Sequence, residues 1–390
     1  MKARQIAPGV EWMGALDRDR RLFDELIPLP DGTSYNAYLV RGSEKTALLD
    51  TVDPAKSDEL MRQLDTVSKV DFLIIQHVEQ DHSGSAQLVL DRYPEAQLVA
   101  SPKAQSMIAD HLGIPIERIR TVEDRETLSL GDRTLEFIHA PWVHWPETML
   151  TYLREDRILF TCDLFGSHLA TTDLFAVDRP RVHEAAKRYF AEIMMPFSTM
   201  IRGHLKKLAD LDIDVIGPSH GPVYDDPSLI LDAYDHWVND PPKNTVVLPH
   251  VSMHGSTARM VDYLIEGLTD RGIHVESFDM SRTDLGAYAT QLVDAATVVF
   301  ASPTVLVGPH PNIVFAAYLT GALRPKLKHA AVIGSFGWAS KAAEQAQALC
   351  ANLKAEWFEP VLTKGLPDEE TFAALDRLAD EIAESHRALA

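Results

Sequence analysis

Cysteine is scarce in this chain of 390 residues, which contains only Cys162 and Cys350. Two thiols can form neither a disulfide framework nor a metal site of four thiolates. A chain of this size without crosslinks is typical of a reducing compartment. The cysteine count therefore favours an intracellular protein.

Long apolar runs and an excess of basic charge are also missing. No window approaches the ~20 apolar residues of a membrane-spanning helix, and residues 1–8 lack the apolar run of a signal peptide. Acidic residues outnumber basic ones 57 to 37, for a formal net charge of −20. This charge disfavours nucleic acid and anionic membranes as partners. We expect a soluble, cytoplasmic protein that binds neither.

The sequence does contain enough apolar residues, 46%, for more than one buried core. Its length favours two or three domains. The best boundary is Asp240-Pro241-Pro242-Lys243-Asn244, where two prolines can continue neither a helix nor a central strand. Residues 229–238, just before it, are expected to form a bridging helix. We predict two domains, at residues 1–240 and 244–390.

The C-terminal half alternates regularly between strand-like runs and helical patterns. This alternation predicts a doubly wound parallel sheet of the α/β class, with ligand loops at the carboxyl ends of its strands. The expected strands are 245–251, 274–280, 296–301, 328–333 and 356–361, and the expected helices are 257–271, 312–323, 340–351 and 368–388.

The N-terminal half is less regular and indicates a mixed αβ layered domain. Short strands are expected at 10–15, 37–41 and 46–50, followed by a helix at 54–65 and a buried strand at 71–76.

Four side chains that can bind a metal follow this buried strand within six residues. They are His77, Glu79, Asp81 and His82, at the point where a strand ends and a helix should begin. A lone histidine is more often structural, but four such groups together would be costly to desolvate without a ligand. The cluster therefore predicts a metal site.

Three further candidate ligands, His144, Asp163 and His220, each follow an apolar run. Loops of this kind converge on one edge of a sheet, so these residues are expected to join the first four.

This pattern resembles the metallo-β-lactamase superfamily, whose usual motif H-x-H-x-D-H commonly binds zinc. Here Glu79 stands where the second histidine is expected. The additional carboxylate is a hard, negative ligand that favours redox iron or manganese over zinc. The H-x-E-x-D-H pattern, with its separate His, Asp and His, resembles the flavodiiron protein family, also called A-type flavoproteins or rubredoxin:oxygen oxidoreductases. The resemblance implies an N-terminal metallo-β-lactamase-like αββα sandwich.

The resemblance also implies a ligand set for two irons. One iron takes His77, Glu79 and His144, and the other takes Asp81, His82 and His220. Asp163 bridges them. Two ferrous ions and three carboxylates leave one positive charge, which a single hydroxide neutralises.

A candidate phosphate site lies in the first loop of the C-terminal half. There a strand is followed by hydroxyls, a glycine and a helix N-terminus, whose N–H groups favour a phosphate. Hydroxyl residues are also common as simple helix caps. The loop residues are Ser252, Met253, His254, Gly255, Ser256 and Thr257.

Two later loops place small residues, hydroxyls and aromatics after the third and fourth expected strands. The C-terminal half resembles flavodoxin, which implies FMN with its phosphate on the first loop and its isoalloxazine ring between the later two. Trp338 is either a flavin contact or a core aromatic. The later loop residues are Ser302, Pro303 and Thr304, and Ser335, Phe336, Gly337 and Trp338.

The two modules together imply an enzyme that passes electrons from FMN to a non-haem di-iron site. Dioxygen would be reduced to water there, or nitric oxide to nitrous oxide. One alternative is a zinc hydrolase with an appended flavodoxin domain, and another is an electron carrier with a decayed metal site. The sequence leaves the choice between the two gases open.

The family resemblance implies a head-to-tail homodimer or a dimer of dimers. In such a dimer Trp145 is either a flavin neighbour or a residue packed beneath its own loop. The chain ends at Ala390 without Cys-x-x-Cys pairs, so a separate donor is expected, either a rubredoxin-like protein or a reduced deazaflavin.

Overall fold

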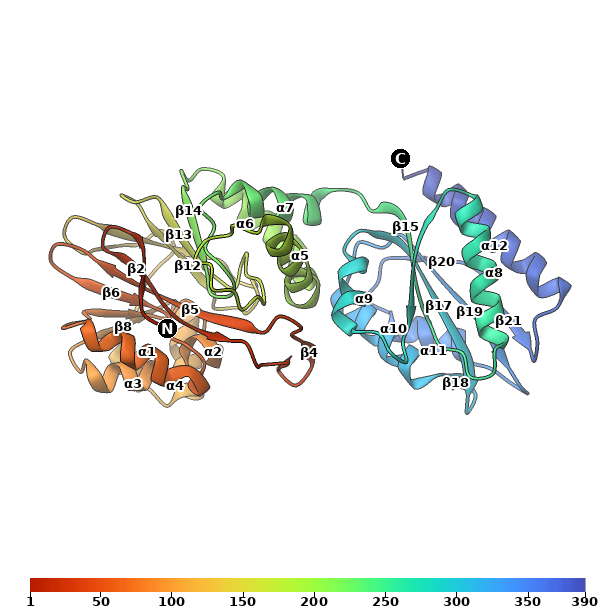
Figure 1. Cartoon of the computed structure of the whole chain (residues 1–390), viewed down its shortest axis with the longest axis horizontal. Coiled ribbons are helices and arrows are strands. Elements are labelled where there is room, and N and C mark those ends of the chain that lie inside the picture. Colours follow the sequence, from red (N-terminus) through yellow and green to blue (C-terminus); the bar gives the residue numbers. More distant parts are fainter. Residues whose placement is uncertain (390) are drawn as a thin grey trace. The chain divides into compact units, whose positions relative to one another are not determined.

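The computed structural model describes residues 1–389 and divides the chain into two compact units. The first unit consists of Met1–Phe190 and Phe197–Val238, and the second of Ala191–Pro196 together with the chain from Asn239 onward. Both units appear in Figure 1. No helix within residues 1–389 has the length and apolar character needed to cross a membrane.

The first unit contains a seven-stranded sheet in the order β1-β2-β5-β6-β7-β8-β9. Strands β6 to β9 are parallel neighbours, and the strands from β1 to β6 pair antiparallel. The bounds are β1 Arg4–Ala7, β2 Val10–Asp17, β5 Thr33–Arg41, β6 Thr46–Leu49, β7 Phe72–Ile74, β8 Gln97–Ala100 and β9 Ile119–Thr121. A separate hairpin joins β3 Leu22–Phe23 to β4 Ile27–Pro28.

A second sheet of five strands has the order β10-β11-β12-β13-β14. The two sheets share a core in which Tyr38 and Ile74 of the first meet Phe137 and Phe160 of the second. The rings of Tyr38 and Phe160 lie 4.8 Å apart. The bounds are β10 Thr127–Ser129, β11 Thr134–His139, β12 Met149–Leu153, β13 Ile158–Cys162 and β14 Val215–Pro218.

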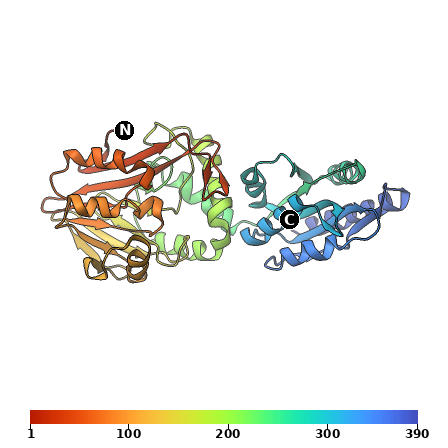
Figure 2. The same ribbon diagram turned by 90° about the horizontal axis from the view of Figure 1, so that it is seen from below.

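Helices cover the outer faces of both sheets. Leu60, Leu90 and Ile108, from α1 Ser57–Gln63, α3 Ala86–Arg92 and α4 Pro102–Leu112, pack on the first sheet. Helices α5 Arg179–Tyr189, α6 Ser198–Leu208 and α7 Ser228–Asn239 lie on the side of the second sheet in Figures 1 and 2. The predicted αββα sandwich is confirmed.

The second unit is a parallel sheet in the order β16-β15-β17-β19-β20. In chain order this is 2-1-3-4-5, the flavodoxin-like arrangement, and the predicted fold is confirmed. The strands are β15 Lys243–His250, β16 His274–Asp279, β17 Ala295–Val305, β19 His329–Phe336 and β20 Glu356–Trp357. Two short strands pair with them: β18 Gly308–Pro309 with β17, and β21 Val361–Lys364 with β19. Helices α8 Ser256–Asp270 and α12 Glu369–Arg387 cover one face, and α9 Leu285–Leu292, α10 Pro311–Leu323 and α11 Ala342–Leu349 cover the other (Figure 1).

Two details of this unit differ from the sequence prediction. Helix α9 was not predicted, although Asp284 caps it by accepting a hydrogen bond from the N–H of Gly286 at 2.8 Å. The strand expected at 356–361 is broken into β20 and β21. Pro360 lies in the gap, and a proline cannot donate a hydrogen bond to the sheet.

We predict that His386 on α12 makes the stability of this unit depend on pH. Its Nε2 lies 2.7 Å from Thr297 Oγ1 and its Nδ1 lies 2.8 Å from Asn244 Oδ1. Burial, and then the charge of His329, lower the pKa of His386 to about 4, against ~6.5 in an unfolded chain. Neutral His386 therefore makes its full contribution to the free energy of unfolding above pH ~6.5. This contribution is lost as the pH falls toward 4.

We expect the urea midpoint of the wild-type chain to fall more than that of His386→Gln between pH 7 and pH 5. Equal falls in the two proteins would show that His386 does not contribute.

Candidate functional site

The first four predicted ligands lie where β7 ends and a short helix, α2 Gln80–Ser83, begins. Glu79 is the residue that precedes α2, and Asp81 and His82 lie within it. Two hydrogen bonds from Thr51, through its N–H at 2.6 Å and its hydroxyl at 2.7 Å, hold the carbonyl of His82. Ser83 Oγ donates to the carbonyl of Val78 at 2.6 Å. The turn that carries the motif is therefore fixed at both ends.

The other three ligands come from the second sheet. Asp163 follows β13 and His220 follows β14, and these two strands are parallel, so their carboxyl ends lie side by side. His144 lies in the loop between β11 and β12. A hydrogen bond of 3.0 Å from the N–H of Met149 to the carbonyl of Gln76 links this loop to the end of β7. The sandwich thus brings together all seven predicted metal ligands.

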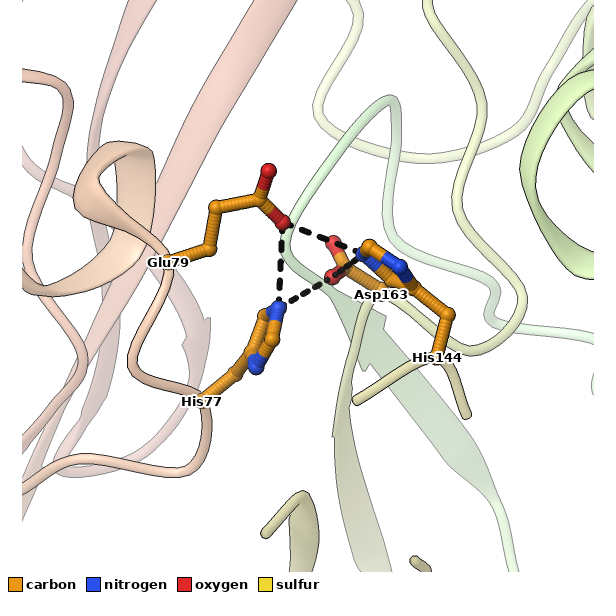
Figure 3. A group of neighbouring side chains, drawn as sticks. All are labelled: His77, Glu79, His144 and Asp163. Atoms are coloured by element: carbon orange, nitrogen blue, oxygen red, sulfur yellow. Dashed lines mark hydrogen bonds and ion pairs between the residues drawn. The ribbon is translucent and has the colours of Figure 1, made fainter. Parts of the chain in front are cut away.

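Four of these side chains converge on one point, as Figure 3 shows. Glu79 Oε2 lies 3.1 Å from Nε2 of both His77 and His144. Asp163 Oδ2 lies 3.4 Å from His77 Nε2 and 3.3 Å from His144 Nε2. We call this group position A.

A second group, which we call position B, consists of Asp81, His82 and His220. Asp81 Oδ1 lies 3.3 Å from His82 Nε2, and its Oδ2 lies 3.3 Å from His220 Nε2. Asp163 Oδ1 lies 3.0 Å from His82 Nε2 and 3.3 Å from His220 Nε2. Asp163 therefore turns one oxygen toward each position.

These distances fit metal binding. Bonds of roughly 2.0–2.2 Å to a metal place neighbouring ligand atoms about 3.0–3.5 Å apart. Within residues 1–389, both side-chain oxygens of Asp81 and of Asp163 are buried and have no hydrogen-bond partner. Buried polar atoms nearly always have a partner, so the donor set fits a cation at each position.

The histidine pKa values show that the cluster attracts positive charge. Burial by itself lowers the pKa of a histidine, but contacts with Asp163 and Glu79 raise that of His144 to about 9. Contacts with Asp163 and Asp81 likewise outweigh burial and raise the pKa of His220 to about 10. Protons and metal cations therefore compete for the same Nε2 atoms.

The outer nitrogens of two histidines fix which ring nitrogen faces the cluster. His220 Nδ1 lies 2.6 Å from the carbonyl oxygen of Ser34, which can only accept a hydrogen bond. His77 Nδ1 lies 2.7 Å from Glu147 Oε1, which also accepts the N–H of Val78 at 3.0 Å. Both Nδ1 atoms therefore donate, which leaves Nε2 available for a metal.

His82 is held differently from these two residues. Its ring is buried and its Nε2 faces Asp81 and Asp163, but its Nδ1 has no hydrogen-bond partner among the described residues. His82 therefore lies in position B without an outer partner that orients its ring.

Sequence reasoning gave no role to two residues around the cluster, Glu147 and His168. Glu147 had a detectable signal, because it lies three residues after His144 in the same loop. His168 is buried, with Nδ1 2.9 Å from Thr33 Oγ1 and its ring 5.0 Å from that of His220. Tyr189 packs on His168 at 4.8 Å. His168 belongs to no motif, so the sequence offered no signal for it.

The predicted flavin loops lie at one edge of the second unit's sheet. Residues 252–255 follow β15, 302–304 form the end of β17, and 337–338 follow β19. These three strands are adjacent and parallel, with Pro303 opposite Ser335. Gly255 precedes α8 with φ +88°, a left-handed conformation that glycine adopts readily.

The side chains of these loops fall into two groups. Some hydroxyls bond within the protein: Ser302 Oγ accepts the N–H of His310 at 2.8 Å, and Thr257 Oγ1 lies 3.1 Å from Ser335 Oγ. Met253 and Trp338 are instead exposed, Trp338 at 78%. Trp338 is therefore not a core aromatic.

Trp145 packs against the cluster of predicted metal ligands in its own chain. Its ring lies 5.0 Å from that of His77 at an interplanar angle of 89°, and 6.1 Å from that of His111. Within the chain, Trp145 thus forms a wall beside position A.

Comparisons with known proteins agree with both units. A family model described as "ODP family beta lactamase" matches residues 33–221. The type A flavoprotein fprA of Rhodobacter capsulatus is 33% identical to this chain, over 97% of the chain and 91% of the relative. A nitric oxide reductase of Moorella thermoacetica is 34% identical, over 85% and 86% respectively.

Among solved structures, the chain is similar to rubredoxin oxygen:oxidoreductase from the anaerobe Desulfovibrio gigas. The two share 28% sequence identity and superpose with a TM-score of 0.95 over 99% of each chain. The matches to the three named proteins span both units. The chain therefore belongs to the flavodiiron family of oxidoreductases, the type A flavoproteins.

Proposed function

We propose that this protein is an FMN- and di-iron-dependent reductase of dioxygen, nitric oxide or both. In this proposal the first unit is the di-iron domain and the second is the FMN domain. The observation that carries the proposal is Asp163, whose two buried oxygens face two separate groups of ligands. A carboxylate in this arrangement is suited to bridge a pair of metals.

The residues of the two positions have distinct proposed roles. His77, Glu79 and His144 hold one iron, and Asp81, His82 and His220 hold the other. An iron pair supplies redox chemistry and open coordination positions to a small gas molecule. The chain supplies the fixed Nε2 donors, the negative charge of three carboxylates, and aromatic walls from the half-buried Trp145 and the buried Phe23.

The exposed edge of the second unit is the proposed flavin site. The first turn of α8 presents main-chain N–H groups, which suit the FMN phosphate. The exposed side chains of Met253 and Trp338 would then cover the isoalloxazine ring, since exposed apolar groups of this kind often mark ligand sites. The loop hydroxyls of Thr257, Ser302 and Ser335 hold the loops in shape.

The partners and the compartment are also proposals. Rubredoxin oxygen:oxidoreductase and nitric oxide reductase are names of proteins similar to this chain, and they support dioxygen and nitric oxide as its substrates. We propose a separate electron donor and a head-to-tail homodimer or a dimer of dimers. The two free, buried thiols, Cys162 and Cys350, suit the reducing cytoplasm.

The zinc hydrolase is the weaker candidate. Glu79 points its carboxylate into position A, where the zinc hydrolases of this fold are expected to have an imidazole. The third candidate, an electron carrier without metal, is disfavoured because all seven ligands converge.

The test is metal and flavin content per chain, on protein produced with iron supplied, followed by gas consumption. We expect two irons and one FMN for each chain, and consumption of dioxygen or nitric oxide by the reduced protein. Two zincs that iron cannot replace would favour the hydrolase, and flavin without metal would favour the carrier.

A further inference from the structure

Glu147 is a buried carboxylate that contacts the cluster without belonging to either metal position. Its side chain is 0% exposed. Its Oε1 accepts hydrogen bonds from His77 Nδ1 at 2.7 Å and from the N–H of Val78 at 3.0 Å. Its own main-chain carbonyl accepts a hydrogen bond from Ser101 Oγ at 2.6 Å. Glu147 is thus fixed at both its backbone and its side chain.

The outer partners differ between the two metal positions. At position A, the Nδ1–H of His77 points to a carboxylate. At position B, the Nδ1–H of His220 points to the neutral carbonyl of Ser34, and His82 Nδ1 has no partner in the described chain. A carboxylate partner makes a ligating imidazole a stronger donor than a carbonyl partner does. The histidines of the two positions therefore differ in their strength as electron donors to a metal.

We propose that Glu147 is a positioning residue that sets the donor strength of His77, so that position A depends on Glu147 and position B does not. This inference rests on the proposed di-iron function. It concerns a residue that lies outside the ligand set and acts through one ligand only, His77.

The hydrogen-bond geometry explains why both orientation and charge matter. Glu147 holds the imidazole with Nε2 toward Glu79 and Asp163, and its negative charge favours a cation beyond the ring. Loss of such a partner typically weakens metal binding by about 10–100-fold.

The test uses the full-length holoprotein loaded with ⁵⁷Fe. Glu147→Gln keeps an acceptor oxygen and the shape of the side chain but removes the charge, and Glu147→Ala removes both. Glu136→Gln is the matched control, because Glu136 is also a buried glutamate of this unit but hydrogen-bonds to Arg125 and Arg154 instead of a ligand. The readouts are iron release to a ferrous chelator and the Mössbauer spectrum of the diferrous protein.

In Glu147→Gln, we expect one of the two irons to be released roughly 10–100-fold faster and the other at the wild-type rate. One Mössbauer doublet should shift while the other stays. Glu147→Ala should release that iron faster still, and Glu136→Gln should match the wild type. A merely structural role for Glu147 would instead affect both irons together.

Two results would overturn the inference. Release and spectra unchanged in Glu147→Gln, or changed equally at both irons, would show that Glu147 does not act on position A alone. Wild-type protein that takes up no iron would overturn the proposed function itself, and this inference with it. The wild-type iron content therefore separates the two failures.

Discussion

Asp163→Asn should abolish gas consumption and leave the flavin content unchanged. Asparagine keeps one oxygen but replaces the other with an NH₂ group, which donates hydrogen bonds and does not bind a metal. Because one Asp163 oxygen faces each metal position, the substitution removes a ligand from one of them. It also removes one of the three negative charges of the cluster, which are needed to balance two divalent ions.

The expected loss of turnover is at least roughly 100- to 1,000-fold, the equivalent of the several kcal/mol that a metal ion can contribute to a transition state. Turnover is measured with gas electrodes on the reduced protein. Iron content should fall below two per chain, and the flavin absorbance should keep its wild-type intensity, because FMN is proposed to bind the second unit.

Asp71→Asn is a suitable control for this variant. Asp71 lies immediately before β7, at the opposite end of that strand from the metal ligands, and pairs with Lys69 at 2.6 Å and with Lys45 at 3.4 Å. We expect it to keep both irons and full turnover. If Asp163→Asn also kept both irons and its turnover, the bridging role would be wrong.

The convergence of the predicted metal ligands could be anticipated, because each segment that carries them follows a recognisable apolar strand. Parallel strands bring their carboxyl ends to one edge, so Asp163 and His220 had to be neighbours once β13 and β14 were parallel. The sequence could not show how the ligands are held. The outer partner of His220 is the main-chain carbonyl of Ser34, an atom that every residue possesses and no motif marks.

For the flavin loops, too, the sequence predicted the position of the residues but not how their side chains are held. Their place at the sheet edge followed from the alternation of strands and helices. Which hydroxyls face inward did not follow, because the pairing of Thr257 with Ser335 depends on how α8 packs on β19. The sequence likewise could not show whether Trp338 is buried or exposed, because this depends on the strand register.

Replacing Glu79 with histidine should change which metal the site retains. Glu79 is the one residue that separates this motif from H-x-H-x-D-H. Its Oε2 lies 3.1 Å from Nε2 of both His77 and His144, so a side chain at this position contributes directly to position A. Glu79→His exchanges a hard, charged oxygen for an imidazole, which suits zinc as well as iron.

We expect the ratio of zinc to iron in Glu79→His to rise by about tenfold or more over the wild type, since even the outer partners of a ligand change metal affinity by 10–100-fold. Gas consumption should be lost, because zinc has no redox chemistry. Both proteins are produced with equal iron and zinc supplied, and the metals are counted by mass spectrometry.

Glu79→Gln separates the loss of charge from the gain of an imidazole. It should lose metal from position A without gaining zinc, because a neutral amide is a weaker ligand than either side chain. If Glu79→His instead kept two irons and its turnover, Glu79 would not determine the metal. The departure from the zinc motif would then carry no information, and only the iron content of the wild-type protein could decide between oxidoreductase and hydrolase.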